Sequence, residues 1–253
     1  MSRTLARGVF ALLTAALSAT VLLPRARAAD FVPKAEWTFA SGRAGSDFGL
    51  PLAAIGDVNG DGYADFAAGA MRWSESLPYQ GRIVAFYGSP SGPANAPDWI
   101  LDGDQEGSAQ SQVSPAGDVN GDGYDDVLVG ADYYKRGNTW NDTNNGRAQL
   151  YLGSPQGLGH APAWSVVGEA EQNFFAYVHA AGDVNGDGFD DVLVTAIAAE
   201  FYSGKAYLFL GSATGLDAEP AWVRVGAHGM AMLQAYGVGD VNGDGYDLSL
   251  IHI

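Results

Sequence analysis

Residues 117–124 read Gly-Asp-Val-Asn-Gly-Asp-Gly-Tyr, and this string decides the fold because it recurs along the chain. Four copies occur, the third with Phe189 in place of the tyrosine, at spacings of 61, 65 and 57 residues, with their first aspartates at Asp57, Asp118, Asp183 and Asp240. A tryptophan precedes each of these aspartates by 18 to 20 residues, at Trp37, Trp99, Trp164 and Trp222. Two features with one period indicate a repeated structural unit of about sixty residues.

Each unit is predicted to contain four short strands. An apolar segment such as 52–55 precedes the acidic string, and a β-rich segment such as 126–129 follows it. A third strand starts at a Gly-Arg or Gly-Lys pair, as in 146–154, and the fourth carries the periodic tryptophan, which we expect in the core between units. This pattern predicts an all-β fold: β-propeller blades of four antiparallel strands, about three complete blades plus the start of a fourth, hence a partial propeller.

The acidic string is predicted to bind a cation. In residues 57–65, oxygen-bearing side chains occupy loop positions 1, 3, 5 and 9, and glycine at position 6 permits a sharp reversal. Position 7 would add its backbone carbonyl. This many hard oxygens favours Ca²⁺ over Mg²⁺, which sheds its water reluctantly. Without a cation, carboxylates about 4 Å apart would repel by roughly 1 to 4 kcal/mol.

We therefore expect one structural Ca²⁺ per acidic loop, in the loops 57–65, 118–126, 183–191 and 240–247. An EF-hand is excluded, because position 12 holds Ala68, Val129 or Val194 where that motif requires glutamate. A solvated Asn-Gly or Asp-Gly hairpin turn without metal stays open as an alternative. The predicted ligands are Asp57, Asn59, Asp61, Tyr63 and Asp65; Asp118, Asn120, Asp122, Tyr124 and Asp126; Asp183, Asn185, Asp187, Phe189 and Asp191; and Asp240, Asn242, Asp244 and Tyr246.

The loop and the following Val-Leu-Val-Gly-Ala at 127–131 resemble the FG-GAP repeats of the integrin α-subunit type β-propeller, which also occur in bacterial secreted proteins. The "FG" half stands as Phe48-Gly49, and the "GAP" half lacks its proline at 69–70 and 130–131. The resemblance covers residues 35–247. It implies calcium in the hairpin between the first two strands of each blade, on the face opposite the ligand-binding face.

The charge and composition of the chain limit the kinds of partner and site that it can have. The chain has 13 Lys plus Arg against 29 Asp plus Glu, a formal charge of −16, which excludes nucleic acid as a partner. The absence of cysteine excludes disulfides and zinc-thiolate sites. A basic start, an apolar run and an Ala-x-Ala ending predict a signal peptide at residues 1–28, with an uncleaved anchor as the alternative. We expect a secreted protein, extracellular or periplasmic, with no membrane span after cleavage.

The expected function is adhesion or recognition of a protein or carbohydrate, without catalysis. None of the four histidines has a motif partner, and no nucleophile elbow or phosphate loop is present. An alternative is an accessory or partial catalytic propeller of an extracellular enzyme, of the polysaccharide lyase or phospholipase type, with its chemistry further along the full-length protein. Aromatic residues in the loops between second and third strands are the candidate ligand contacts: Trp73, Tyr79, Tyr133, Tyr134, Trp140, Phe201 and Tyr202.

The fourth repeat departs from the others. Its ninth loop position is Leu248 instead of aspartate, and the remaining residues read Leu-Ser-Leu-Ile-His-Ile. Family propellers usually have seven blades, more than this chain can form. We expect residues 29–247 to be propeller repeats from a longer protein and residues 248–253 to be a non-native tail.

Overall fold

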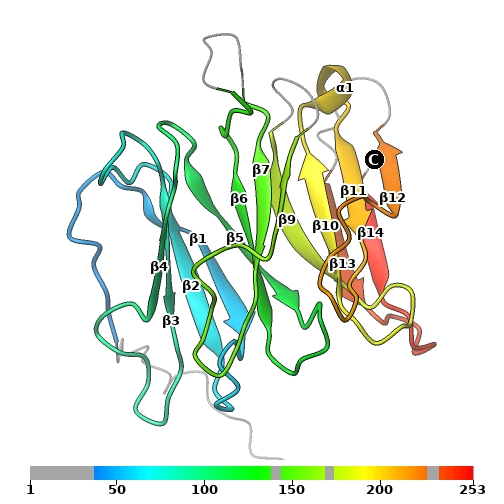
Figure 1. Cartoon of the computed structure of the whole chain (residues 1–253), viewed down its shortest axis with the longest axis horizontal. Helices are drawn as coiled ribbons and strands as arrows, with labels where there is room; N and C mark the ends of the chain where they lie inside the picture. The colour runs from blue at the N-terminus through cyan, green and yellow to red at the C-terminus, as the bar shows by residue number, and fades with distance from the viewer. Residues whose placement is uncertain (1–36, 138–143, 169–173, 227–233, 253) are drawn as a thin grey trace, which may run out of the picture. The chain divides into compact units, whose positions relative to one another are not determined.

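The computed structural model describes residues 37–137, 144–168, 174–226 and 234–252 (Figure 1). The predicted signal peptide lies outside these residues. Three antiparallel sheets of four strands follow one another in chain order, and a two-stranded sheet comes last. The strands are β1 Phe48–Gly56, β2 Asp65–Ala70, β3 Arg82–Phe86 and β4 Trp99–Asp102; β5 Gln110–Gly117, β6 Asp126–Ala131, β7 Arg147–Tyr151 and β8 Trp164–Val167; β9 Phe175–Gly182, β10 Asp191–Ala196, β11 Lys205–Phe209 and β12 Trp222–Val225; and β13 Gln234–Gly239 with β14 Leu248–His252.

The prediction of an all-β partial propeller is confirmed. Neighbouring strands in each sheet are consecutive in sequence, so each four-stranded sheet is one blade of the predicted repeat and the two-stranded sheet is the start of a fourth. The first strands lie side by side, β1 against β5, β5 against β9 and β9 against β13. The only helix among the described residues is a single turn, α1 Ala199–Tyr202, between β10 and β11. No described helix has the length and apolar character needed to cross a membrane.

The acidic strings form the hairpins between the first and second strands of each blade. Three hairpins close on the same kind of pair, glycine opposite the ninth-position aspartate: Gly56 with Asp65, Gly117 with Asp126, and Gly182 with Asp191. In the fourth, Gly239 pairs with Leu248, and the segment predicted as a tail supplies β14. The hairpins therefore occupy one end of every blade, and the loops between second and third strands occupy the other.

The hydrophobic core lies between blades, because the second and third strands bury both of their faces. One cluster joins β2 and β3 to the second blade through residues such as Ile83, Val113 and Val127. Another joins the second and third blades through residues such as Leu128, Leu150 and Val192. The first strands also pack on the preceding blade where one is described: Val113 of β5 is 7% exposed, whereas Leu52, at the equivalent position of β1, is 67% exposed and has no preceding blade among the described residues.

The periodic tryptophans connect successive blades, as predicted. Trp99 packs edge-on against Tyr151 at 5.2 Å between ring centroids, and its indole N–H donates to the carbonyl of Gly159 at 2.9 Å. Trp164 does the same one blade later, against Phe209 and the carbonyl of Asp217. The fourth of the series, Trp222, is 40% exposed, because the described part of the fourth blade has no third strand to lie over it.

Candidate functional site

The side chains of each acidic hairpin turn inward onto its own backbone. In the second hairpin, Asp118 accepts the N–H groups of Asp122 at 3.0 Å and Gly123 at 2.8 Å, one on each carboxylate oxygen. Asn120 Oδ1 accepts the same Asp122 N–H at 3.1 Å, and Asp122 Oδ1 accepts the N–H of Tyr124 at 3.1 Å. The equivalent bonds recur in the other three hairpins. The residues predicted at positions 1, 3 and 5 are thus brought together around one turn.

The ninth-position aspartate ties each complete hairpin to the end of the third strand. Asp126 is fully buried and accepts two backbone N–H groups, from Val119 at 3.0 Å and from Gly153 at 2.9 Å. Asp65 and Asp191 make the same two kinds of bond in their own blades. The fourth hairpin lacks this anchor because Leu248 stands in its place.

The pKa of Asp126 is raised to about 7: burial raises it most, the N–H groups of Gly153 and Val119 lower it, and the nearby carboxylates of Asp122 and Asp118 raise it. Burial likewise raises the pKa of Asp191 to about 6, with contributions from Asp187 and Asp183. Two carboxylates therefore face a third, buried one, and no basic side chain is bonded to Asp126 among the described residues. A cation bound nearby would favour the charged form of Asp126 and lower its pKa.

The donor set of the hairpins fits a hard cation. Each hairpin offers only oxygen donors, and a carboxylate oxygen that accepts one N–H has a further lone pair. Within the described ranges, no three His, Cys, Asp or Glu side chains converge closely enough to form a ready-made metal cluster. Coordination would therefore require the side-chain oxygens to rotate partly away from the backbone N–H groups.

The aromatic residues predicted for the opposite face divide into two groups. Tyr79 is 59% exposed. Tyr133 is 40% exposed, and its ring packs edge-on with the ring of Phe174. Trp73 is buried instead of exposed, so its prediction as a surface contact is wrong: the guanidinium groups of Arg43 and Arg82 lie over its ring, at 4.7 and 4.1 Å from the centroid.

None of the other predicted aromatic residues has a side chain that is described as exposed. Tyr134 is partly covered by Arg147, whose guanidinium lies 3.9 Å from its ring centroid. Phe201 and Tyr202 belong to α1, and Trp140 lies outside the described residues.

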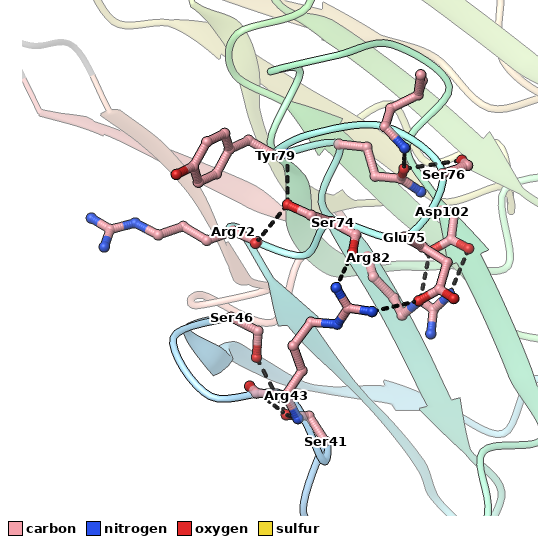
Figure 2. Close-up of polar contacts among 12 residues, drawn as sticks. Ser41, Arg43, Ser46, Arg72, Ser74, Glu75, Ser76, Tyr79, Arg82 and Asp102 are labelled. Carbon is pink, nitrogen blue, oxygen red and sulfur yellow. Dashed lines mark hydrogen bonds and ion pairs between the residues drawn. The ribbon is translucent and has the colours of Figure 1, made fainter.

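A pocket of about 540 Å³ with a mixed polar and apolar lining adjoins Tyr79 at this end of the first blade. Arg43 donates to the carbonyl of Ser74 and pairs with Glu75 at 3.1 Å, which fixes the loop (Figure 2). Arg72 is mostly exposed and uses its Nε to pair with Asp47 at 3.1 Å. Figure 2 shows the side chains of Arg72 and Tyr79 extending from the loop in the same direction, away from this network. Sequence reasoning missed the two arginines, although basic residues are rare in this chain.

A buried aspartate at the same end of the second blade gives a pH-dependent prediction. Burial raises the pKa of Asp132 from 3.8 to about 6, and the only side chain that donates to it among the described residues is Gln112, at 3.4 Å. Between pH 3.8 and about 6, Asp132 keeps its proton in the folded protein but loses it in the unfolded chain. The free energy of unfolding therefore falls as pH rises through this range. The full effect above pH 6 is about 3 kcal/mol.

The substitution Asp132→Asn removes this ionisation. We expect the variant to be more stable than the wild type at pH 7.5, by up to about 3 kcal/mol, and to lose that advantage near pH 4. Urea denaturation at both pH values measures the difference. If the variant and the wild type differed in unfolding free energy by the same amount at both pH values, folding would not raise the pKa of Asp132.

Sheets of four antiparallel strands in chain order, each with an acidic hairpin between its first two strands, define a bladed β-propeller protein. The sequence-family model of the FG-GAP repeat matches residues 52–86, 110–151 and 175–209, which correspond to the first three strands of the three complete blades. The chain belongs to the FG-GAP repeat family and has the propeller type of the integrin α subunits.

Similar proteins support this assignment. Integrin alpha-IIb of Mus musculus is 32% identical over 156 residues, covering 58% of this chain and 14% of that protein. Integrin alpha-V of Gallus gallus is 30% identical over 175 residues, covering 68% of this chain and 16% of that protein. Integrin alpha-PS2 of Drosophila melanogaster is 41% identical over 96 residues, covering 33% and 6%. The chain thus spans less than a fifth of the length of each of these relatives.

Proposed function

We propose that this protein is a secreted, calcium-stabilised propeller module that recognises a protein or carbohydrate ligand in adhesion. The observation that carries the proposal is the acidic hairpin, which has the same inward-facing oxygen donors in every described blade. The relatives support it at the level of the family, since their printed names are those of integrin α subunits. The signal peptide expected at residues 1–28 supports export.

Calcium has a structural role in this proposal. The side chains at positions 1, 3, 5 and 9 and the carbonyl at position 7 would hold it, and the fourth hairpin would lack the ninth-position donor. The bound cation would neutralise carboxylates that otherwise repel one another and Asp126, Asp65 or Asp191 beneath them. Because the ninth aspartate also bonds the third strand, neutralising it would strengthen the connection between hairpin and blade.

The ligand face in this proposal is the end of the blades opposite the hairpins. Antiparallel strands place the loop between second and third strands there, and Tyr79, Tyr133 and Arg72 present exposed aromatic and basic groups on it. Tyrosine and arginine are enriched at protein interfaces, because they combine contact area with hydrogen bonding. Arg72 additionally favours a ligand that carries a carboxylate.

Calcium titration tests the metal part of the proposal. Isothermal titration calorimetry of residues 29–253 with CaCl₂ is expected to show binding at three complete hairpins and weaker binding at the fourth. Replacing Asp57, Asn59 and Asp61 by alanine should remove one of the strong sites. Absence of any binding heat at millimolar calcium would contradict the proposal.

Ligand capture tests the recognition part. Extracellular matrix proteins and a glycan array serve as probes in the presence of calcium, and the double variant Tyr79→Ala, Tyr133→Ala is expected to lose about tenfold or more in affinity for whatever the wild type retains. Ile100→Ala, at an exposed position of β4, is the matched control and should bind normally. Equal binding by the double variant would place the ligand elsewhere.

A further inference from the structure

The eighth position of the acidic hairpins carries a second series of aspartates that have a different environment from the ninth. Asp125, Asp190 and Asp247 occupy it in the second, third and fourth hairpins, whereas the first hairpin has Ala64. The ninth-position side chains point into their own blade. The eighth-position side chains contact the hairpin of the preceding blade, more than sixty residues earlier in the sequence.

The contact is a reciprocal pair of hydrogen bonds between the eighth residue of one hairpin and the first residue of the hairpin before it. The carboxylate of Asp125 accepts the backbone N–H of Asp57 at 2.7 Å, and the N–H of Asp125 donates to the carbonyl of Asp57 at 3.3 Å. The distances are 2.8 and 3.2 Å between Asp190 and Asp118, and 3.0 and 2.9 Å between Asp247 and Asp183.

The residue before the first aspartate must be glycine for this contact to form. Gly56 has a φ of +83°, and a Cβ atom there would lie 2.1 Å from the carboxylate oxygen of Asp125. Gly117 and Gly182 meet Asp190 and Asp247 at 2.1 and 1.9 Å in the same way. In the first three copies of the string, the glycine before the first aspartate is therefore required by contact with an aspartate of the next blade.

Two further contacts hold the preceding hairpin from the same side. The ring of Tyr124 covers Gly60, where an added Cβ would lie 2.5 Å from a ring carbon, and the N–H of Ser154 donates to the carbonyl of Val58 at 3.0 Å. The fourth hairpin provides a comparison within the molecule. No following blade is described beyond it, and an added Cβ at Gly243 would meet nothing within 4 Å.

We propose that Asp125, Asp190 and Asp247 are positioning residues that clasp the hairpin of the preceding blade, fix the backbone of its first metal-binding aspartate, and are not ligands of their own hairpin. The clasps connect the four hairpins in series, so ordering of one hairpin favours the calcium-competent form of the one before it. The geometric part stands on the hydrogen bonds alone; the calcium part rests on the proposed function.

Hydrogen–deuterium exchange of residues 29–253, read by mass spectrometry on peptides that cover single hairpins, tests both parts. In EDTA, Asp125→Ala should speed exchange in the peptide containing Asp57 by roughly tenfold, the effect of losing one charge-assisted bond, and leave the peptide of residues 118–126 nearly unchanged. Asp125→Asn keeps an acceptor oxygen and should restore most of the protection. Ala64→Asp is the matched control: it adds the same side chain where no preceding hairpin is described, and should protect nothing.

A calcium series by the same method separates the two parts. The calcium concentration that protects hairpin 57–65 should rise about tenfold in Asp125→Ala, while that of hairpin 118–126 stays within a factor of two. A rise confined to hairpin 118–126 would overturn the proposal by making Asp125 a ligand of its own hairpin. Unchanged exchange at Asp57 in EDTA would refute the clasp itself, whereas a wild type that ignores calcium would refute the proposed function and the serial coupling of calcium sites.

Should Asp125→Ala fail to fold, Asp190→Ala repeats the experiment one blade later. Its expected effect falls on hairpin 118–126 and spares hairpin 183–191, because Asp190 bonds Asp118. An effect on hairpin 183–191 alone would overturn the proposal in the same way.

Discussion

Chelation of calcium with EDTA is expected to lower the midpoint of thermal unfolding by about 20 °C. At a free calcium concentration one hundred times Kd, each site contributes about 2.7 kcal/mol, so three complete hairpins contribute about 8 kcal/mol. In a chain of this size each kcal/mol moves the midpoint by about 2–4 °C. Differential scanning calorimetry with calcium, with EDTA and after calcium is restored measures the shift.

A charge-neutralised variant separates binding from nonspecific effects of the chelator. Replacing Asp61, Asp122 and Asp187 by asparagine keeps an acceptor oxygen for the backbone N–H but removes one charge from each complete hairpin. Its midpoint in calcium should approach that of the chelated wild type and should respond little to EDTA. Magnesium should not restore the wild type, because it keeps its water. An unchanged midpoint in EDTA would contradict a structural role for calcium.

The repeat and its strands could be predicted from sequence because both depend on local patterns. The acidic string sets a hairpin, apolar alternation sets the strands on either side, and turn residues separate them. The segments 52–55 and 126–129 accordingly fall within β1 and β6. The placement of the tryptophans between blades followed from their sharing the period of the fold.

Contacts between distant residues were harder to predict. Trp73 was predicted as a ligand contact because it is an aromatic residue in a loop between second and third strands, but Arg43, thirty residues earlier, covers it together with Arg82. Asp125 and Asp126 are adjacent and chemically identical, yet one bonds residue 57 of the preceding blade and the other residues 119 and 153 of its own. Only the three-dimensional arrangement of successive blades distinguishes them. The sequence signal for the difference is Ala64, the single hairpin residue at this position that is not aspartate.

The substitution Trp99→Ala is expected to destabilise the protein by about 3–5 kcal/mol, because it removes a large buried side chain. Trp99 is 2% exposed and fills the space between the first two blades, where it packs on Tyr151. Alanine would leave a cavity there and would also leave the carbonyl of Gly159 without its indole donor. Urea denaturation in saturating calcium measures the change in the free energy of unfolding.

Trp222→Ala is the matched control, since the same repeat position is 40% exposed in the third blade. Its expected effect is within about 1 kcal/mol, the range of surface substitutions. Trp99→Phe should lie between, because phenylalanine retains the ring contact with Tyr151 but not the N–H. The comparison holds residue type and repeat position constant and changes only whether a following blade covers the ring. Equal losses at Trp99 and Trp222 would mean that the tryptophan acts within its own blade, and the packing between blades would then not be the source of its stabilising effect.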